Sequence, residues 1–293
     1  MYEKLEICPS CNSKYISNHS IVKDLSISQE SFALSLCKTC TLLFTNPRPT
    51  QEQITRFYES DNYISHVGNS TGFRALVYRL VRKYTLYQKH QLIKNYTAKK
   101  SLLDYGSGTG SFLNYMLARG YAISGIEPHA NARANTPSTI VPFVKEKLSS
   151  ATTSVKHDII TAWHVFEHVH ELHSTIKGLR KALTDNGYMF VALPNHESPD
   201  AKYYKQYWAG YDVPRHLYHF DKQAFTHLVA DSKLKVIKIL PMHFDAYYVS
   251  MLSEQYQQHS IPFVRGLVQG YLSNRSASQS LNYSSLIYVL QKV

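Results

Sequence analysis

Residues 101–110 read SLLDYGSGTG, and residues 111–119 continue as SFLNYMLAR. Leu102 and Leu103 favour a short strand, the glycines predict a tight turn, and the next residues favour a helix that Gly120 would end. A strand, a glycine-rich loop and a helix in this order open the doubly wound α/β folds that bind nucleotides. The stretch therefore predicts an α/β domain with a mostly parallel sheet.

The same stretch indicates which kind of ligand the loop accepts. Gly106, Gly108 and Gly110 let the backbone approach a ligand at positions where a Cβ would clash. The spacing is G-x-G-x-G, whereas a dinucleotide site reads G-x-G-x-x-G, and Asp104 directly precedes the loop. An acid at this point favours a cationic sulfonium ligand with an amino group and would repel a pyrophosphate.

Further along the chain, the apolar pattern continues the alternation of strands and helices. A second strand over 122–127 ends in Glu127, about 20 residues past the loop, where a carboxylate can bind both ribose hydroxyls. We expect further strands over 139–144, 158–164, 188–194, 234–240 and 285–291, helices over 172–183 and 221–231, and a turn at 186–187. Residues 247–258 and 273–285 suggest a helical insertion before the last strand.

All four cysteines lie near the N-terminus as two C-x-x-C pairs, Cys8 with Cys11 and Cys37 with Cys40. Zn²⁺ binds four thiolates tetrahedrally, and a C-x-x-C turn places two sulfurs on one ion. The alternative, four unrelated buried cysteines, does not explain the paired spacing. We therefore expect a zinc-ribbon-like module over residues 1–48 with a structural Zn²⁺, because four protein ligands leave no open position on the metal.

The composition describes a chain with enough apolar residues for a real core. Of 293 residues, 44% are hydrophobic and 18% charged, which excludes an intrinsically disordered chain, and the formal net charge is +11. The N-terminal MYEKLEICPS lacks the apolar segment of a signal peptide, and no run approaches the roughly 18 apolar residues of a membrane span. We expect a cytoplasmic protein whose cysteines are reduced or bind metal.

A cationic segment precedes the glycine-rich loop. Apolar residues at helical spacing from Phe73 to Tyr87 predict a helix, and residues 62–103 carry eight Lys or Arg but no Asp or Glu. One interpretation is a solvated helix face. The other is a patch that faces an anion, such as nucleic acid, acidic lipid or a phosphorylated substrate.

Several motifs in this order resemble a known family. LLDYGSGTG at 102–110, followed by GIEP at 125–128, resembles motifs I and II of class I S-adenosylmethionine-dependent methyltransferases. The resemblance continues through HDIITAWHVFEHVHEL (157–172), LRKALTDNGYMFVALPN (179–195) and WAGYDVPRHLYHF (208–220), and covers roughly residues 75–293. It implies a Rossmann-like, doubly wound, seven-stranded, mostly parallel sheet. The stretch at 208–220 is similar to bacterial small-molecule and sugar-modifying members of the family, some of which also carry a cysteine-rich zinc module.

The resemblance also implies the contacts with the cofactor, S-adenosyl-L-methionine. Asp104 and the loop glycines would approach its methionine part and Glu127 its ribose, while residues at the end of the fourth strand would line the mouth of the site. The expected cofactor-binding residues are Asp104, Gly106, Ser107, Gly108, Gly110, Phe112, Glu127, Pro128, Ala162, Trp163 and His164.

Methyl transfer from a sulfonium is an in-line displacement, and a hydroxyl or carbon-acid acceptor also needs a base. Histidine suits that task, and residues 208–220 follow the fifth strand, on the side of the sheet where ligands of such folds bind. We expect His216 as the base, His219 as the second candidate and Asp212 beside them, with Arg215, Trp208 and Asn195 contacting the substrate. Arg215 would hold a phosphate or carboxylate. The alternative for these residues is a structural hydrogen-bonded loop.

A zinc-peptidase pattern, H-x-x-E-H, occurs at residues 164–168. That chemistry needs both histidines on one face of a continuous helix and a third ligand. Here His164 falls at the end of a predicted strand, so we reject a peptidase. Glu167 and His168 are interpreted as helix-start residues that complement the helix dipole.

The sequence thus predicts three parts: the cysteine module, 1–48; a linker with a short helix, 49–72; and a methyltransferase domain, 73–293, with an insertion at about 245–284. The predicted function is methyl transfer to a small molecule such as a sugar or nucleotide-sugar, including anionic acceptors. Two alternatives remain open. One is an RNA methyltransferase whose zinc module and basic helix hold the phosphate backbone. The other is a non-catalytic binding module.

Overall fold

The computed structural model describes residues 2–58 and 73–293, and in the first long helix it describes side chains from residue 80 onward. The described residues group into two compact units. The first contains residues 2–58, 164–173 and 192–288, and the second contains residues 73–163, 174–191 and 289–293. Most of the predicted linker, residues 59–72, lies outside the described residues.

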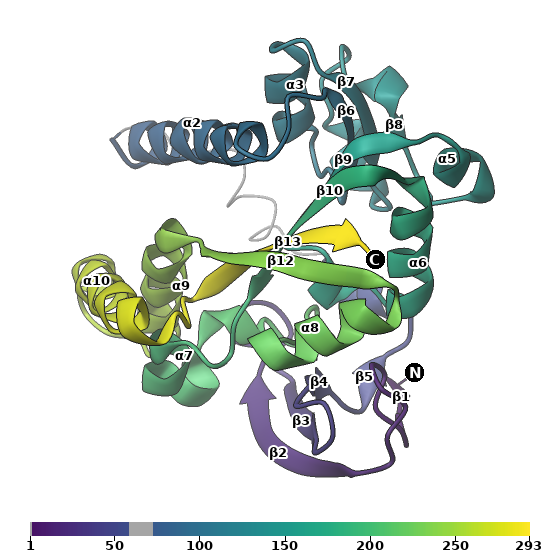
Figure 1. The fold of residues 1–293 in the computed structure, drawn as a ribbon. Helices are drawn as coiled ribbons and strands as arrows, with labels where there is room; N and C mark the ends of the chain where they lie inside the picture. The colour runs from purple at the N-terminus through teal and green to yellow at the C-terminus, as the bar shows by residue number, and fades with distance from the viewer. Residues whose placement is uncertain (1, 59–72) are drawn as a thin grey trace. The chain divides into compact units, whose positions relative to one another are not determined.

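A seven-stranded sheet carries the α/β fold, with strand order β12-β13-β10-β9-β6-β7-β8 (Figure 1). The strands are β6 (Ser101–Tyr105), β7 (Ala122–Ile126), β8 (Val144–Lys145), β9 (His157–Trp163), β10 (Leu183–Pro194), β12 (Leu234–Pro241) and β13 (Ser285–Lys292). Strand β6 pairs in parallel with both β7 and β9, and β7 pairs in parallel with β8. The predicted doubly wound, seven-stranded α/β fold is confirmed.

Helices follow the strands as the predicted alternation requires. They are α2 (Phe73–Lys94), α3 (Ser111–Leu117), α4 (Ala130–Ala134), α5 (Ser150–Ser154), α6 (Leu172–Ala182), α7 (Pro199–Tyr204) and α8 (Lys222–Asp231). In the second unit, Leu113 and Met116 of α3 are fully buried, and Leu102 and Ile160 of the sheet are buried with them. Burial of these apolar side chains fixes the position of the loop between β6 and α3.

Two details of the sheet differ from the sequence-based expectation. The run 139–144 is not a strand, because Val141–Phe143 form a 3-10 helix and β8 begins at Val144. Pro142 has no N–H for the strand ladder, so pairing starts only after it. The expected turn at 186–187 is also wrong, since β10 runs through both residues. A Cβ on Gly187 would lie 3.0 Å from the Asp158 carbonyl oxygen, so this glycine allows a close approach of two strands.

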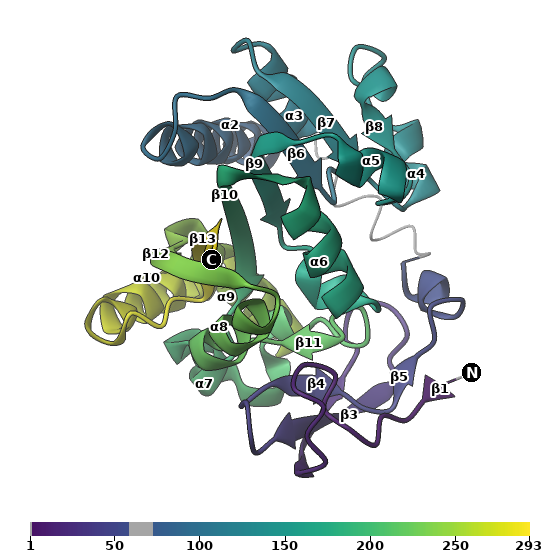
Figure 2. The ribbon, with the colours of Figure 1, turned by 45° about the vertical axis from the view of Figure 1, so that its right-hand side comes forward.

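The first unit contains a small antiparallel sheet with the order β11-β4-β3-β2 (Figure 2). Its strands are β2 (Ile16–Lys23), β3 (Ser31–Cys37), β4 (Leu43–Thr45) and β11 (Tyr218–His219), and a second pair joins β1 (Tyr2–Glu3) to β5 (Arg48–Pro49). The short helix expected before residue 72 is a 3-10 helix, η1 (Ile54–Phe57). Because β11 pairs with β4, the cysteine-bearing segment and residues 218–219 share one sheet.

The segment predicted as a helical insertion forms two long helices of the first unit, α9 (His243–Tyr256) and α10 (Pro262–Ser280), which pack side by side (Figure 1). Gly266 and Gly270 of α10 face the backbone of α9. A Cβ on Gly270 would lie 2.7 Å from the Tyr247 Cα, so the helices are too close for any side chain there.

Gly270→Ala is therefore expected to destabilise the protein by about 1–3 kcal/mol, because the added methyl forces the helix pair apart. Alanine itself favours a helix by about 1 kcal/mol over glycine, so any loss reports the clash. Urea unfolding measures it. Ser276→Ala, at an exposed position of the same helix, serves as the matched control and should leave the midpoint unchanged. A Gly270→Ala variant as stable as that control would show that the helices are not in close contact.

Candidate functional site

The loop between β6 and α3 forms a tight backbone cradle in the second unit. Gly106, Gly108 and Gly110 adopt φ values of 75°, 55° and 73°, in the left-handed region that favours glycine. The Gly106 N–H donates to the Ile126 carbonyl at 2.7 Å, which ties the loop to β7. A Cβ on Gly108 would meet no atom of the described residues within 4 Å, so among these residues this side of the loop is open.

Asp104, at the end of β6, is 2% exposed. Its carboxylate accepts a hydrogen bond of 2.6 Å from the Thr161 hydroxyl on the neighbouring strand β9. Burial raises the pKa of Asp104 to about 7, against the lowering effects of Thr161 and of the Lys89 ammonium. A buried acid with this pKa is poised to gain from a bound cation.

Glu127 follows β7 and organises the same loop. One carboxylate oxygen accepts from the Gly108 N–H at 2.7 Å and the other from the His129 N–H at 2.8 Å. Each oxygen has a further lone pair, so the carboxylate can still accept from hydroxyl groups of a ligand. The adjacent Pro128 is exposed, and its carbonyl accepts from Arg133.

Aromatic side chains gather beside this loop. The rings of Phe112 and Trp163 pack edge to face with centroids 5.8 Å apart, and the Lys89 ammonium lies 4.4 Å from the Trp163 ring centroid. Ala162, which is fully buried, precedes Trp163 on β9.

The sequence analysis placed Lys89 only within a general cationic segment. The signal that could have singled it out is its helical spacing from Arg82, one of the cations on the same helix.

Two buried polar atoms near the cradle have no hydrogen-bond partner among the described residues: the Ser107 hydroxyl and the Trp163 indole N–H. Buried polar groups are normally bonded, so both atoms have the capacity for a hydrogen bond to a water or a ligand. Together with the open space at Gly108 and the buried Asp104, they fit a small polar cation with a sugar part. The residues predicted for the cofactor thus lie together in the second unit, except His164, which belongs to the first.

His164 lies between two carboxylates of the first unit. Its Nε2 is 3.0 Å from Asp245 and its Nδ1 is 3.4 Å from Glu167. Burial alone would lower the pKa of His164, but the two acids raise it to about 10. We therefore expect a protonated His164 at neutral pH.

A second group of polar side chains surrounds the residues predicted as catalytic. The His216 Nδ1 lies 2.9 Å from the Gly210 carbonyl oxygen, and its ring centroid is 4.6 Å from that of His168. Burial lowers the pKa of His216 to about 4 and that of His219 well below its usual range. The His219 Nε2 lies 3.3 Å from the Thr45 hydroxyl. The low pKa of His216 disfavours it as a general base, and burial shifts the pKa of His219 in the same direction.

Arg215 holds this group together rather than facing an open site. It is 1% exposed, and it donates to Asp212 at 2.6 Å, to Asp24 at 3.2 Å and to the Phe57 carbonyl at 3.0 Å. Against the effect of burial, the Arg215 guanidinium lowers the pKa of Asp212 to about 2. A fully paired guanidinium has few donors left for a substrate anion, so the geometry favours a structural role.

Trp208 and Asn195 are also bonded within the first unit. The Trp208 indole N–H donates to Asp200 at 2.8 Å, and the Asn195 amide donates to the Tyr283 carbonyl at 3.1 Å. Both residues are at most 2% exposed. The structural alternative is therefore favoured over substrate contact for both, since their polar atoms are already paired.

The H-x-x-E-H segment does not form one helix. Strand β9 ends at Trp163, and residues 166–168 form the 3-10 helix η3 (Phe166–His168), so a peptidase-type zinc helix is excluded here. Glu167 does lie in the first turn of η3, as predicted, but no side chain of the described residues caps this helix. The Glu167 carboxylate is 0% exposed and accepts no hydrogen bond from any residue that the structure describes.

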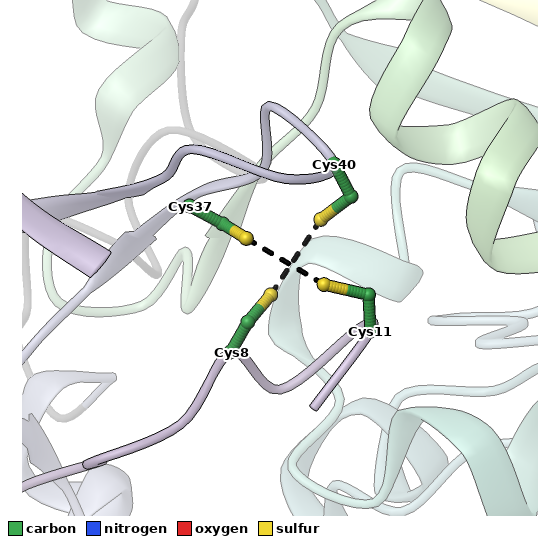
Figure 3. A group of neighbouring side chains, drawn as sticks. All are labelled: Cys8, Cys11, Cys37 and Cys40. Atoms are coloured by element: carbon green, nitrogen blue, oxygen red, sulfur yellow. Dashed lines mark hydrogen bonds between the residues drawn. The ribbon is translucent and has the colours of Figure 1, made fainter. Parts of the chain in front are cut away.

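The four cysteines meet at one point (Figure 3), with their sulfur atoms directed toward a common centre. All four Sγ atoms lie within 4.8 Å of one another, and the pairs Cys8–Cys40 and Cys11–Cys37 are 3.6 and 3.5 Å apart. None forms a disulfide. Burial raises the pKa of Cys37, but backbone N–H groups of the C-x-x-C turn outweigh it and lower this pKa to about 7.

Comparison with known proteins identifies the family. A family profile described as "Methyltransferase domain" matches residues 78–239, more than half of the chain. The chain belongs to this family. The order of its seven-stranded sheet is typical of class I methyltransferases.

Two curated relatives are ubiquinone biosynthesis O-methyltransferases. The one from Glaesserella parasuis serovar 5 (strain SH0165) is 31% identical over 110 residues, which cover 33% of this chain and 46% of the relative. The one from Rickettsia conorii (strain ATCC VR-613 / Malish 7) is 23% identical over 146 residues, 46% of this chain and 50% of the relative. The chain thus spans about half the length of the curated relatives it matches.

Two matches among solved structures have TM-scores just under 0.5. The O-methyltransferase from a trans-AT PKS multienzyme of Brevibacillus brevis, in complex with S-adenosyl-L-homocysteine, is 16% identical, with a TM-score of 0.49 over 75% of this chain and 76% of that one. A putative sarcosine dimethylglycine methyltransferase from Galdieria sulphuraria is 10% identical, with a TM-score of 0.49 over 73% and 86%. Among the described residues, no helix is both long and apolar enough to cross a membrane.

Proposed function

We propose that the protein transfers a methyl group from S-adenosylmethionine to a small-molecule acceptor such as a sugar, a nucleotide-sugar or a similar metabolite. The observation that carries this proposal is the buried Asp104 beside an open glycine cradle that Glu127 organises. An acid of this kind suits the ammonium group of the cofactor's methionine part. The Glu127 carboxylate suits the ribose hydroxyls.

Each of these residues has a separate task in that proposal. When bound, the cofactor supplies the activated methyl group. Asp104 would hold the amino group, the loop amides would approach the methionine carboxylate, and Glu127 would fix the sugar. The edge-to-face pair of Phe112 and Trp163 would cover the site and exclude water. Fixing both partners in line is the main contribution an enzyme makes to such a displacement.

We further propose that the cysteine cluster binds one structural Zn²⁺. With Zn–S bonds of about 2.3 Å, the sulfurs of a tetrahedral site lie about 3.8 Å apart. The Sγ–Sγ distances of 3.5 Å (Cys11–Cys37) and 3.6 Å (Cys8–Cys40) are close to that edge length. Four protein ligands leave no open position, so this ion would stabilise the fold and take no part in chemistry.

Titration calorimetry of the full chain tests the proposed function. S-adenosylhomocysteine is expected to bind with one site per chain, and NAD is expected to give no heat. Binding of NAD but not of S-adenosylhomocysteine would overturn the assignment, and binding of neither would leave only a non-catalytic module.

The acceptor class is tested by mass spectrometry with S-adenosylmethionine and panels of hydroxylated metabolites, with RNA as a parallel arm. A methylated metabolite supports the proposal. Methylated RNA would favour the RNA alternative instead. In that case the affinity for RNA should fall as the salt concentration rises, by about one log unit per log unit of salt for each phosphate contact.

A further inference from the structure

Three side chains of the first unit converge on one point outside the cofactor cradle. They are Glu167 and His168 of η3 and His216, which lies just before β11. One ligand atom from each lies within 4.8 Å of the other two. The two imidazole rings are 4.6 Å apart between centroids at an interplanar angle of 74°, so they approach the point from different directions.

The Glu167 carboxylate has no hydrogen bond to offset its burial. It is 0% exposed, and within the described part of the chain neither of its oxygens has a hydrogen-bond partner. The His164 ring approaches to 3.4 Å on one side, but it also pairs with Asp245 at 3.0 Å. The protonated His164 is thus one cation shared by two carboxylates, and a buried carboxylate that is only partly compensated still costs several kcal/mol unless a further cation binds.

Each of the two histidines holds its Nδ1 against a backbone carbonyl, and the His216 Nε2 lies 3.9 Å from Asp212. The His168 Nδ1 lies 3.0 Å from the Arg215 carbonyl oxygen, and the His216 Nδ1 lies 2.9 Å from the Gly210 carbonyl oxygen. A carbonyl only accepts, so each Nδ1 carries the proton and each Nε2 keeps its lone pair. Histidines that bind metals are oriented in this way by a backbone carbonyl on the other ring nitrogen.

We propose that Glu167, His168 and His216 bind one divalent first-row transition-metal ion of the class Mn²⁺, Fe²⁺, Co²⁺ or Zn²⁺. Two imidazoles and a carboxylate are a donor set that these ions accept. This site differs in kind from the cysteine cluster. Three protein ligands leave positions open for water or for oxygen atoms of a ligand, so the ion acts as a Lewis acid toward what it binds.

The test uses Mn²⁺ alone as the probe, because Mn²⁺ prefers nitrogen and oxygen ligands to thiolates. The full chain is isolated, its bound metals are counted by elemental analysis, and Mn²⁺ is titrated while electron paramagnetic resonance records the free ion. Per chain, the wild-type protein is expected to hold one divalent ion more than the Glu167→Gln variant does. This extra ion is either Mn²⁺ taken up in the titration or an ion retained through purification. Where Mn²⁺ binding is measurable in the variant, its affinity should be at least tenfold weaker.

His216→Asn is expected to behave like Glu167→Gln, and His227→Gln, an exposed histidine on α8, should bind as wild type does. A readout on the wild-type protein avoids any dependence on folded variants. In protein loaded with Mn²⁺, pulsed resonance should show couplings to imidazole nitrogen. Equal metal content and affinity in wild type and Glu167→Gln, or bound Mn²⁺ without nitrogen couplings, would overturn the proposal.

Discussion

Asp104→Asn is expected to weaken binding of S-adenosylhomocysteine by about 10- to 100-fold. The amide cannot supply the negative charge that pairs with the ligand's ammonium group, and hydrogen bonds to charged groups contribute about 1.5–3 kcal/mol. Titration calorimetry measures the loss. Asp185→Asn, an exposed acid that pairs with Lys292 in the same unit, is the matched control and should bind the ligand normally.

The pH dependence of that affinity gives a second signature. The Asp104 pKa is raised to about 7 by burial, so below that pH the free protein holds a neutral acid. Binding a cationic group then requires release of that proton, and the affinity should fall by up to about tenfold for each pH unit below 7. The Asn variant should show no such slope. An unchanged affinity in Asp104→Asn would contradict the placement of the methionine part at this residue.

The same substitution should stabilise the ligand-free protein. Because the folded pKa of Asp104 lies above its ordinary value of 3.8, the folded state binds more protons than the unfolded state between about pH 4 and pH 7. Stability is therefore lost as the pH rises through that window. The cost reaches roughly 4 kcal/mol above pH 7. Urea unfolding at pH 8 should show the Asn variant to be more stable, and a less stable variant would contradict a buried, uncompensated acid.

The cofactor cradle could be predicted from the sequence because the residues that form it lie close together along the chain. A strand, an acid, three spaced glycines and a helix are contiguous, and the next acid follows one β-α-β unit later. These local features are present in the structure: Glu127 bonds to the loop amide of Gly108, and Asp104 lies buried beneath it. Contact with the cofactor itself stays a prediction.

The partners of residues 208–220 could not be predicted in the same way, because burial of a polar side chain depends on residues that are distant in the sequence. The sequence shows Arg215 in a polar loop, but Asp24 and the Phe57 carbonyl, which pair with it, lie more than 150 residues earlier. His168 and His216 likewise come together only through the fold. Pairing of β11 with β4 was equally out of reach, since two-residue strands leave no periodic pattern.

Cys40→Ser is expected to remove zinc from the chain and to destabilise the small sheet of the first unit by several kcal/mol. Zinc binding by structural cysteine sites contributes about 10–16 kcal/mol in isolated zinc-finger peptides, and a serine ligand recovers little of it. Elemental analysis should find one zinc less than in wild type, and urea unfolding should show a lower midpoint. Lys38→Ala, an exposed neighbour in the same C-x-x-C turn, should keep both.

Loss of the zinc should also affect residues 216–219, because β4 connects the cysteines to this segment. Thr45 of β4 donates its hydroxyl proton to the His216 carbonyl at 2.8 Å, and the Thr45 N–H donates to the Leu217 carbonyl at 3.0 Å. Loss of the metal would free β4 and leave both carbonyls unpaired. Hydrogen exchange should therefore rise at residues 216–219 as well as at 37–45. A zinc-free Cys40→Ser protein with unchanged exchange in 216–219 would show that the cysteine cluster supports only its own turns.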